Sequence, residues 1–156
     1  MKSILALTAA SVLLFGSAAH AGDAAVEATI RQFGEAFNKG DVKAAKALHI
    51  AAPTIIDDVA PHHWSGPDAF DQWLSDLAKS ETAEGKTEAQ VTISPPTREV
   101  ISGDRAYVVV PSAYTFKQKG KTLRAAAQMT FVLAKETSGW RILSWTWTAP
   151  QEASVK

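Results

Sequence analysis

The sequence predicts an α+β domain in which a curved antiparallel sheet packs on three helices that precede it in the chain. Two observations carry this prediction. Segment 105–148 alternates apolar and polar residues with a period of two, which is typical of strands with one buried face. Segments 24–39, 42–49 and 67–78 instead repeat their apolar residues every three or four positions, as amphipathic helices do.

The first helix is predicted over Ala24–Lys39, and a helix stop follows at Gly40. Its single apolar stripe consists of Val26, Ile30, Phe33 and Phe37. Asp41 is placed to cap a shorter second helix, Val42–His49.

A small strand insert separates the second and third helices. Pro53 ends the helical stretch, Thr54–Asp57 is a short strand, and Val59–Trp64 is either its partner or an irregular arm. Ser65-Gly66-Pro67-Asp68 then starts the third helix, with Ser65 or Gly66 as the cap, and the apolar stripe runs to about Ala78. The polar segment Lys79–Lys86 is predicted to be a mobile loop.

Four long strands complete the domain. The first, Glu88–Ile101, is broken by Pro95-Pro96, so we expect it at the edge of the sheet. The other three are Arg105–Gln118, Lys121–Glu136 and Trp140–Thr148, joined by turns at Lys119-Gly120 and Thr137–Gly139. A polar tail begins at Pro150.

These turn lengths fix a register for the three-stranded ribbon. It pairs Tyr114 with Ala125, Ser112 with Ala127, Val110 with Met129, and Phe131 with Trp145. The same register places Leu143, Trp145 and Trp147 on the buried face and Ile142 on the outer face.

The buried face contains a patch of small residues, Ser112, Ala125 and Ala127, beside Tyr114 and Trp147. Either a helix packs closely there or the patch lines a ligand pocket with aromatic walls. In the pocket interpretation, Ala127→Leu fills the space without loss of stability. The candidate lining residues are Phe33, Trp64 (as a lid or core residue), Ser112, Tyr114, Ala127, Met129, Trp145 and Trp147.

Residues 1–21 have the pattern of a secretory signal peptide. A basic start precedes a twelve-residue apolar run, and the small-residue motif Ala19-His20-Ala21 follows, so we expect cleavage after Ala21 and a periplasmic or secreted domain, 22–156.

No later run has the roughly 20 apolar residues that a spanning helix needs, so no membrane association is expected after cleavage. The domain would have a formal charge of −1, because Lys2 is lost and no acid is, which gives it no electrostatic attraction for nucleic acid. The chain has no cysteine and hence no disulfide or thiolate chemistry.

Several local motifs, in this order, resemble the nuclear transport factor 2-like superfamily, in particular its SnoaL-like and ketosteroid-isomerase-like branches. They are Asn38-Lys39-Gly40-Asp41, Thr54–Gly66 leading into Pro67-Asp68-Ala69-Phe70, Ser102-Gly103-Asp104-Arg105-Ala106 and Gly139-Trp140-Arg141-Ile142. The resemblance covers essentially residues 22–156. It implies a cone-shaped fold with a pocket between sheet and helices, and often a dimer formed through the sheet.

The resemblance also singles out Asp57. Thr54–Asp57 resembles the strand that carries the general-base aspartate of ketosteroid isomerases, and a carboxylate desolvated by aromatic rings would have a raised pKa. The chain departs from that pattern in its oxyanion donors. Phe33 stands where those enzymes have a tyrosine, and Gln128–Val132 has no acid, so steroid isomerisation is not expected.

His62 and His63 are the other catalytic candidates. Adjacent residues of an extended segment point to opposite sides, so at most one of them enters the pocket and pairs with Asp57 as an acid/base dyad. No metal site is predicted, because Asp57, Asp58, His49, His62 and His63 offer no helical His pair. No cofactor motif is present either.

Three hypotheses about function follow. The first is an exported domain that binds a small, largely uncharged apolar molecule. The second is a cofactor-free isomerase, dehydratase or hydrolase that uses Asp57 with His62 or His63. The third is an interaction module that forms a homodimer through the outer sheet face, where Val109, Thr130, Val132 and Ile142 form a moderately apolar surface.

Overall fold

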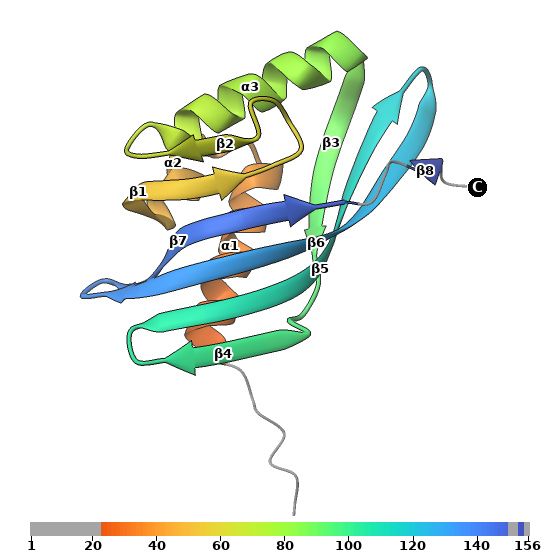
Figure 1. The fold of residues 1–156 in the computed structure, drawn as a ribbon. Coiled ribbons are helices and arrows are strands. Elements are labelled where there is room, and N and C mark those ends of the chain that lie inside the picture. Colours follow the sequence, from red (N-terminus) through yellow and green to blue (C-terminus); the bar gives the residue numbers. More distant parts are fainter. Residues whose placement is uncertain (1–22, 150–152, 155–156) are drawn as a thin grey trace, which may run out of the picture.

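The computed structural model describes residues 23–149 and 153–154, and the predicted signal peptide lies outside the described residues, as does most of the polar tail. Three helices and eight strands follow one another in the described chain (Figure 1). The helices are α1 Ala24–Asn38, α2 Val42–Ala47 and α3 Ala69–Glu84. The strands are β1 His49–Ile56, β2 His63–Ser65, β3 Lys86–Ile93, β4 Arg98–Ser102, β5 Arg105–Gln118, β6 Lys121–Glu136, β7 Gly139–Thr148 and β8 Ala153–Ser154.

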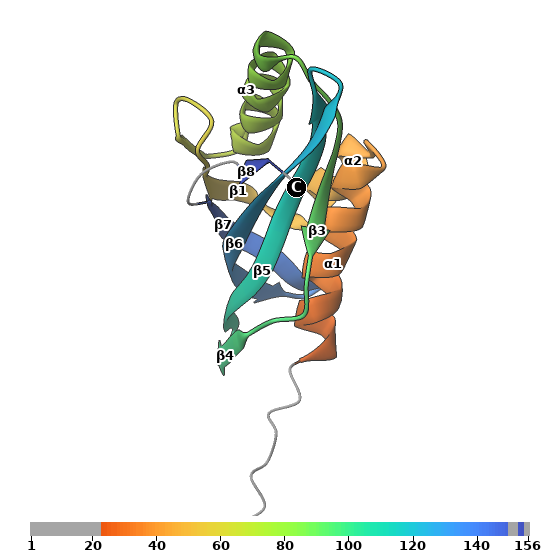
Figure 2. The ribbon, with the colours of Figure 1, turned by 90° about the vertical axis from the view of Figure 1, so that its right-hand side faces the viewer.

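The strands form one curved sheet in the order β2-β1-β7-β6-β5-β3, with β4 also paired to β5 and β8 to β6. All pairs are antiparallel except β1 and β7, which run parallel. Helix α1 packs across one face, here called the inner face, and α3 contacts β1 and β2 at one edge and β3 at the other (Figures 1 and 2). The α+β class and the curved sheet packed on N-terminal helices are therefore confirmed.

The predicted register of the ribbon is confirmed at all four pairs. Tyr114 lies opposite Ala125, Ser112 opposite Ala127, Val110 opposite Met129, and Phe131 opposite Trp145. The two-residue turn explains this accuracy, because Lys119 and Gly120 both have positive φ, at 50° and 73°. That backbone matches the twist of the flanking strands and leaves no slack for a slipped register.

The register prediction was wrong near the start of β7. Val132 pairs with Ser144 but Leu133 pairs with Ile142, so Leu143 is the extra residue of a β-bulge. As a result Ile142 is fully buried, although alternation places it on the outer face, and Leu143 is half-buried. The bulge therefore removes Ile142 from the apolar outer surface that was predicted from alternation.

Two helix boundaries also differ from the predictions. Helix α2 ends at Ala47, and β1 begins at His49 rather than Thr54, with Pro53 inside the strand. Helix α3 begins after Asp68, and continues to Glu84 through the segment predicted as a loop. The reason is that residues 79–84 contain no helix breaker, and Gly85 supplies the left-handed cap at φ 68°.

The predicted edge strand is two strands. Pro95 and Pro96 interrupt it, and its halves, β3 and β4, pair with different parts of β5. Among the described residues, no helix is long and apolar enough to span a membrane.

Candidate functional site

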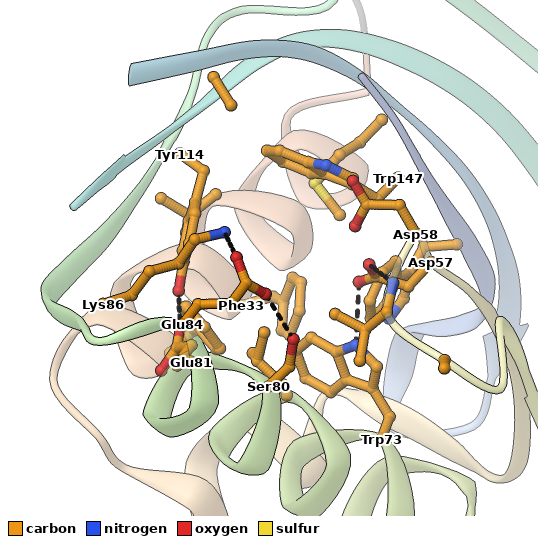
Figure 3. Close-up of a pocket in the computed structure, with 18 residues that line it drawn as sticks. Phe33, Asp57, Asp58, Trp73, Ser80, Glu81, Glu84, Lys86, Tyr114 and Trp147 are labelled. Carbon is orange, nitrogen blue, oxygen red and sulfur yellow. Dashed lines mark hydrogen bonds and ion pairs between the residues drawn. The ribbon is translucent and has the colours of Figure 1, made fainter. Parts of the chain in front are cut away.

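A cavity of about 290 Å³ opens between the inner face of the sheet, α1, α3 and the loop between β1 and β2 (Figure 3). Its lining is mainly apolar and aromatic, with polar groups gathered at two separate places. The lining residues are Phe33, Phe37, Asp57, Asp58, Val59, Ala60, Trp73, Leu77, Ser80, Glu81, Glu84, Lys86, Val91, Tyr114, Ala125, Met129, Trp145 and Trp147. This composition, apolar walls with a few polar groups, is typical of a small-molecule site.

Aromatic rings from α1, α3 and β7 form a rigid part of the wall. Trp73 meets Trp145 edge to face with ring centroids 4.8 Å apart, and Phe33 lies 6.0 Å from Trp145. Trp147 contacts Tyr114 in the same edge-to-face manner at 6.2 Å. Such pairs are stabilised by their ring quadrupoles as well as by area burial, so these contacts help to hold the wall in place.

The buried side chain of His49 fixes the position of Trp145 through a hydrogen bond. The Nδ1 atom of His49 lies 3.0 Å from the Ala45 carbonyl oxygen, and the Trp145 indole N–H donates to His49 Nε2 at 3.2 Å. Nε2 must therefore accept, and Nδ1 carries the proton that it donates to Ala45. Burial lowers the pKa of His49 to about 4, so the ring is neutral at neutral pH.

Asp57 directly follows β1 and points into the cavity (Figure 3). Its Oδ2 accepts the Trp73 indole N–H at 2.9 Å, and its Oδ1 accepts the Val59 backbone N–H at 3.2 Å. Burial against these apolar groups, helped by the neighbouring Asp58 carboxyl, raises the pKa of Asp57 to about 6, although the two hydrogen bonds oppose the shift. The carboxyl group can therefore gain or lose a proton close to neutral pH.

Neither histidine candidate reaches this carboxyl group. Both His62 and His63 are exposed, and the His62 ring lies 3.3 Å from the backbone carbonyl oxygen of Asp57. The β1–β2 pairing explains the position of His63, because Trp64 is turned inward to the core and its neighbour then points out. The structure thus does not bring together the Asp57–histidine dyad, and Trp73 is the side-chain partner of Asp57 instead.

The second polar place lies at the end of α3. The Tyr114 hydroxyl donates to Glu81, and Lys86 forms an ion pair with Glu84 at 3.0 Å (Figure 3). Ser80 donates to Glu84 at 2.8 Å. Burial raises the pKa of Glu81, whereas the Lys86 hydrogen bond lowers the pKa of Glu84. Sequence reasoning missed Ser80, Glu81 and Glu84, because it interpreted their segment as a loop.

Five of the eight predicted lining residues line the cavity, namely Phe33, Tyr114, Met129, Trp145 and Trp147. Trp64 is buried outside it and donates its indole N–H to Asp76 at 3.1 Å. Ser112 and Ala127 face each other beyond the cavity, and Ser112 is buried next to Ile93 of β3. There α1 approaches closely, since a Cβ on Gly34 would lie 2.9 Å from Ile93 Cδ1, so helix packing accounts for the serine end of the small-residue patch. Ala125, at the other end, does line the cavity.

No group of three or more His, Asp or Glu side chains with the arrangement of a metal site occurs within residues 23–149. The polar groups that line the cavity are carboxyl, hydroxyl, indole and ammonium groups.

Comparison with known proteins places the chain in a family. The model of the SnoaL-like domain matches residues 26–150. Three similar solved structures are an NTF2-like protein with a cystatin-like fold from Novosphingobium aromaticivorans, an NTF2-like superfamily protein from Salmonella enterica serovar Typhimurium and a ketosteroid isomerase-like protein from Erwinia carotovora atroseptica.

The first, from Novosphingobium, is 16% identical over 81% of this chain and 80% of its own, with a TM-score of 0.66. The Salmonella protein is 19% identical over 83% and 92%, with a TM-score of 0.65. The Erwinia protein is 22% identical over 82% and 95%, with a TM-score of 0.63. No curated protein sequence matches the chain significantly. At these identities the likeness shows the fold, and the predicted superfamily is confirmed.

Proposed function

This chain belongs to the SnoaL-like domain family of the NTF2-like superfamily, and we propose that after export it binds a small molecule with a largely apolar, ring-sized body in the cavity of Figure 3. The observation that carries the proposal is the wall of aromatic rings around a cavity of about 290 Å³, with the Asp57 carboxylate hydrogen-bonded to one of those rings, Trp73. Family membership alone does not carry it, because one fold hosts many functions.

The test uses a pair of substitutions on neighbouring residues of β6. Ala125 is buried and lines the cavity, whereas Ala126 is exposed on the outer face. Ring-sized alcohols and ketones are titrated into the protein, and tryptophan emission and melting temperature are recorded. We expect binding by the parent protein and the Ala126→Leu variant, and its loss in Ala125→Leu. If no compound shifts either signal, or if both variants bind equally, the proposal fails.

A second candidate function, cofactor-free acid/base catalysis, is favoured by the inward orientation of Asp57 and by its pKa of about 6. A general base is most effective when its pKa lies near the working pH. Asp57 would remove a proton from a carbon next to a carbonyl group and return it elsewhere on the bound molecule.

Exchange of the α-protons of the bicyclic ketone 2-tetralone in D₂O, followed by NMR, measures this activity directly. The protein should accelerate the exchange, and the rate should rise with pH through about 6, where Asp57 becomes a carboxylate. Asp57→Asn should abolish the acceleration. Equal rates with and without the protein would exclude this role for the ketone class.

Export and self-association are parts of the same proposal. Cleavage after Ala21 is tested by mass spectrometry of the protein recovered from the medium or periplasm of expressing bacteria. A homodimer would use the outer sheet face, where Val100 and Tyr107 are 46% and 41% exposed on paired residues of β4 and β5. A monomer in sedimentation at high concentration would argue against it.

A further inference from the structure

The acidic and basic groups of the cavity are unequal in number. Four carboxyl groups line it, those of Asp57, Asp58, Glu81 and Glu84, whereas Lys86 is the single basic side chain among the described lining residues. Lys86 forms an ion pair with Glu84 at 3.0 Å, at the α3 end of the cavity. The charge of the Asp57–Asp58 end is therefore not offset from within the lining.

Among the described residues, the N–H groups that donate to Asp57 are neutral, and the Asp58 carboxyl also lies against it. The two oxygen atoms of Asp57 accept from the Trp73 indole and from the Val59 backbone. Within the described part of the chain, no ion pair that we find includes Asp57 or Asp58. His62 does not supply the missing charge, because its ring contacts the backbone carbonyl of Asp57 and not the carboxylate. A carboxylate half-removed from water with only neutral donors is under-compensated, and a cationic ligand would compensate it.

The surrounding rings favour the same charge. Trp73 donates its N–H to Asp57 and stands edge to face against Trp145, and both rings line the cavity. The face of an indole ring carries negative potential and attracts ammonium groups. The Asp57 carboxylate offers a cation an ion pair and repels an anion; Trp73 turns its N–H edge to Asp57, so any π contact with the ammonium group would come from ring faces elsewhere in the lining.

We propose that the ligand of this cavity is an amine, a monocation with an apolar body about the size of one aromatic ring, whose ammonium group pairs with the Asp57 carboxylate on its cavity side. This inference rests on the proposed binding function and adds the charge and orientation of the ligand. It replaces the largely uncharged ligand that the small-residue patch and its aromatic neighbours predicted with one that is charged at one end.

Three probes of nearly equal size separate the two claims, namely phenethylamine, 2-phenylethanol and phenylacetate. They share the phenylethyl or benzyl body and differ in the terminal group, which is cationic, neutral or anionic. Calorimetric titrations are carried out at low ionic strength and about pH 7.5, because salt screens charge pairs that are partly exposed. We expect the amine to bind about ten-fold more tightly than the alcohol, which corresponds to roughly 1.4 kcal/mol, and phenylacetate to bind most weakly.

Asp57→Asn assigns the preference to one group. In this variant the amine should bind no more tightly than the alcohol, while the affinity for the alcohol stays within about two-fold of the parent value. The matched control is Asp68→Asn, which removes the same charge from an exposed position where the side chain makes no capping hydrogen bond. The control should keep the ten-fold preference.

The pH dependence provides a second readout. The amine preference should fall as the pH drops through about 6, and the Asp57→Asn variant should not show this fall. The other titratable groups around the site are Asp58, Glu81, Glu84, Lys86, Tyr114 and His62. Comparing the pH dependence of the amine preference in the parent and in Asp57→Asn distinguishes the titration of Asp57 from that of these other groups.

The outcomes distinguish the two proposals. Equal affinity for amine and alcohol overturns the amine assignment and leaves the binding function standing. A ten-fold preference that persists in Asp57→Asn overturns the role given to Asp57. If none of the three probes binds, both the amine assignment and the proposed binding function fail for ligands of this size.

Discussion

Replacing Asp57 by asparagine should favour the folded state more at neutral and alkaline pH than in acid. The unfolded chain releases the Asp57 proton near 3.8 and the folded chain near 6, so between these values the folded state binds more protons. The contribution of Asp57 to the free energy of unfolding therefore falls as the pH rises through this window. Two pKa units correspond to roughly 3 kcal/mol, and solvent access to the half-buried carboxyl reduces this to about 1–2 kcal/mol above pH 7.

Asparagine preserves the size of the side chain and an oxygen that accepts the Trp73 N–H, but its NH₂ group replaces the oxygen that accepts the Val59 N–H. The loss of that hydrogen bond costs stability at every pH, so the charge is identified by the part of the difference that changes with pH. The assay is urea unfolding of parent, Asp57→Asn and Asp68→Asn at a series of pH values from about 4 to 8. Relative to its value near pH 4, the stability of the variant compared with the parent should increase as the pH rises to about 6 and then stay constant. A difference between variant and parent that does not change with pH would refute the argument, because it would mean that burial does not raise the pKa of Asp57.

Two further predictions concern the cavity wall. His49→Leu should leave the Trp145 indole N–H without its partner and lower the free energy of unfolding by about 1–3 kcal/mol. The amide oxygen of His49→Gln can accept that N–H, so the free energy of unfolding should fall by less in this variant. Urea unfolding at neutral pH compares the two variants. Ala127→Leu should keep ligand binding, because Ala127 lies outside the lining, while Ala125→Leu abolishes it; loss of binding in Ala127→Leu, measured by tryptophan fluorescence titration, would mean that the cavity extends further along β6.

The strands could be predicted because the patterns that identify them involve residues close together in the sequence. Alternation identifies a strand with one buried face, and the glycine turns set the pairing of β5, β6 and β7, so Tyr114 and Ala125 could be placed opposite each other from the sequence alone. The bulge at Leu143 was not predictable in this way. Its cause is the packing of Ile142 into the core, where β1 also pairs with the same strand, and alternation does not record such contacts.

The candidate site was predictable only in part. The position of Asp57 at the end of a strand could be inferred, but its partner could not. Trp73 comes from α3, and the parallel pairing of β1 with β7 brings Asp57 to it, although no local pattern indicates a parallel strand in this chain. Glu81 and Glu84 were missed for a different reason, because a polar stretch without an apolar stripe is weak evidence against a helix when its residues are good helix formers.

Asp57 and His49 titrate in the same pH range with opposite effects on stability. Burial raises the pKa of the acid to about 6 and lowers that of the base to about 4. For His49 the unfolded state binds more protons between about 4 and 6.5, so its contribution to stability is lost as the pH falls through that window, whereas the contribution of Asp57 changes the other way. The two slopes largely cancel in the parent protein, whose stability should therefore vary little between about pH 4 and 6. A free energy of unfolding that does not change with pH would therefore not mean that the core lacks ionisable groups with shifted pKa values. Each pH dependence can be measured in a single variant. Between about pH 4 and 6, the free energy of unfolding of Asp57→Asn should rise with pH, because His49 still titrates, and that of His49→Gln should fall with pH, because Asp57 still titrates.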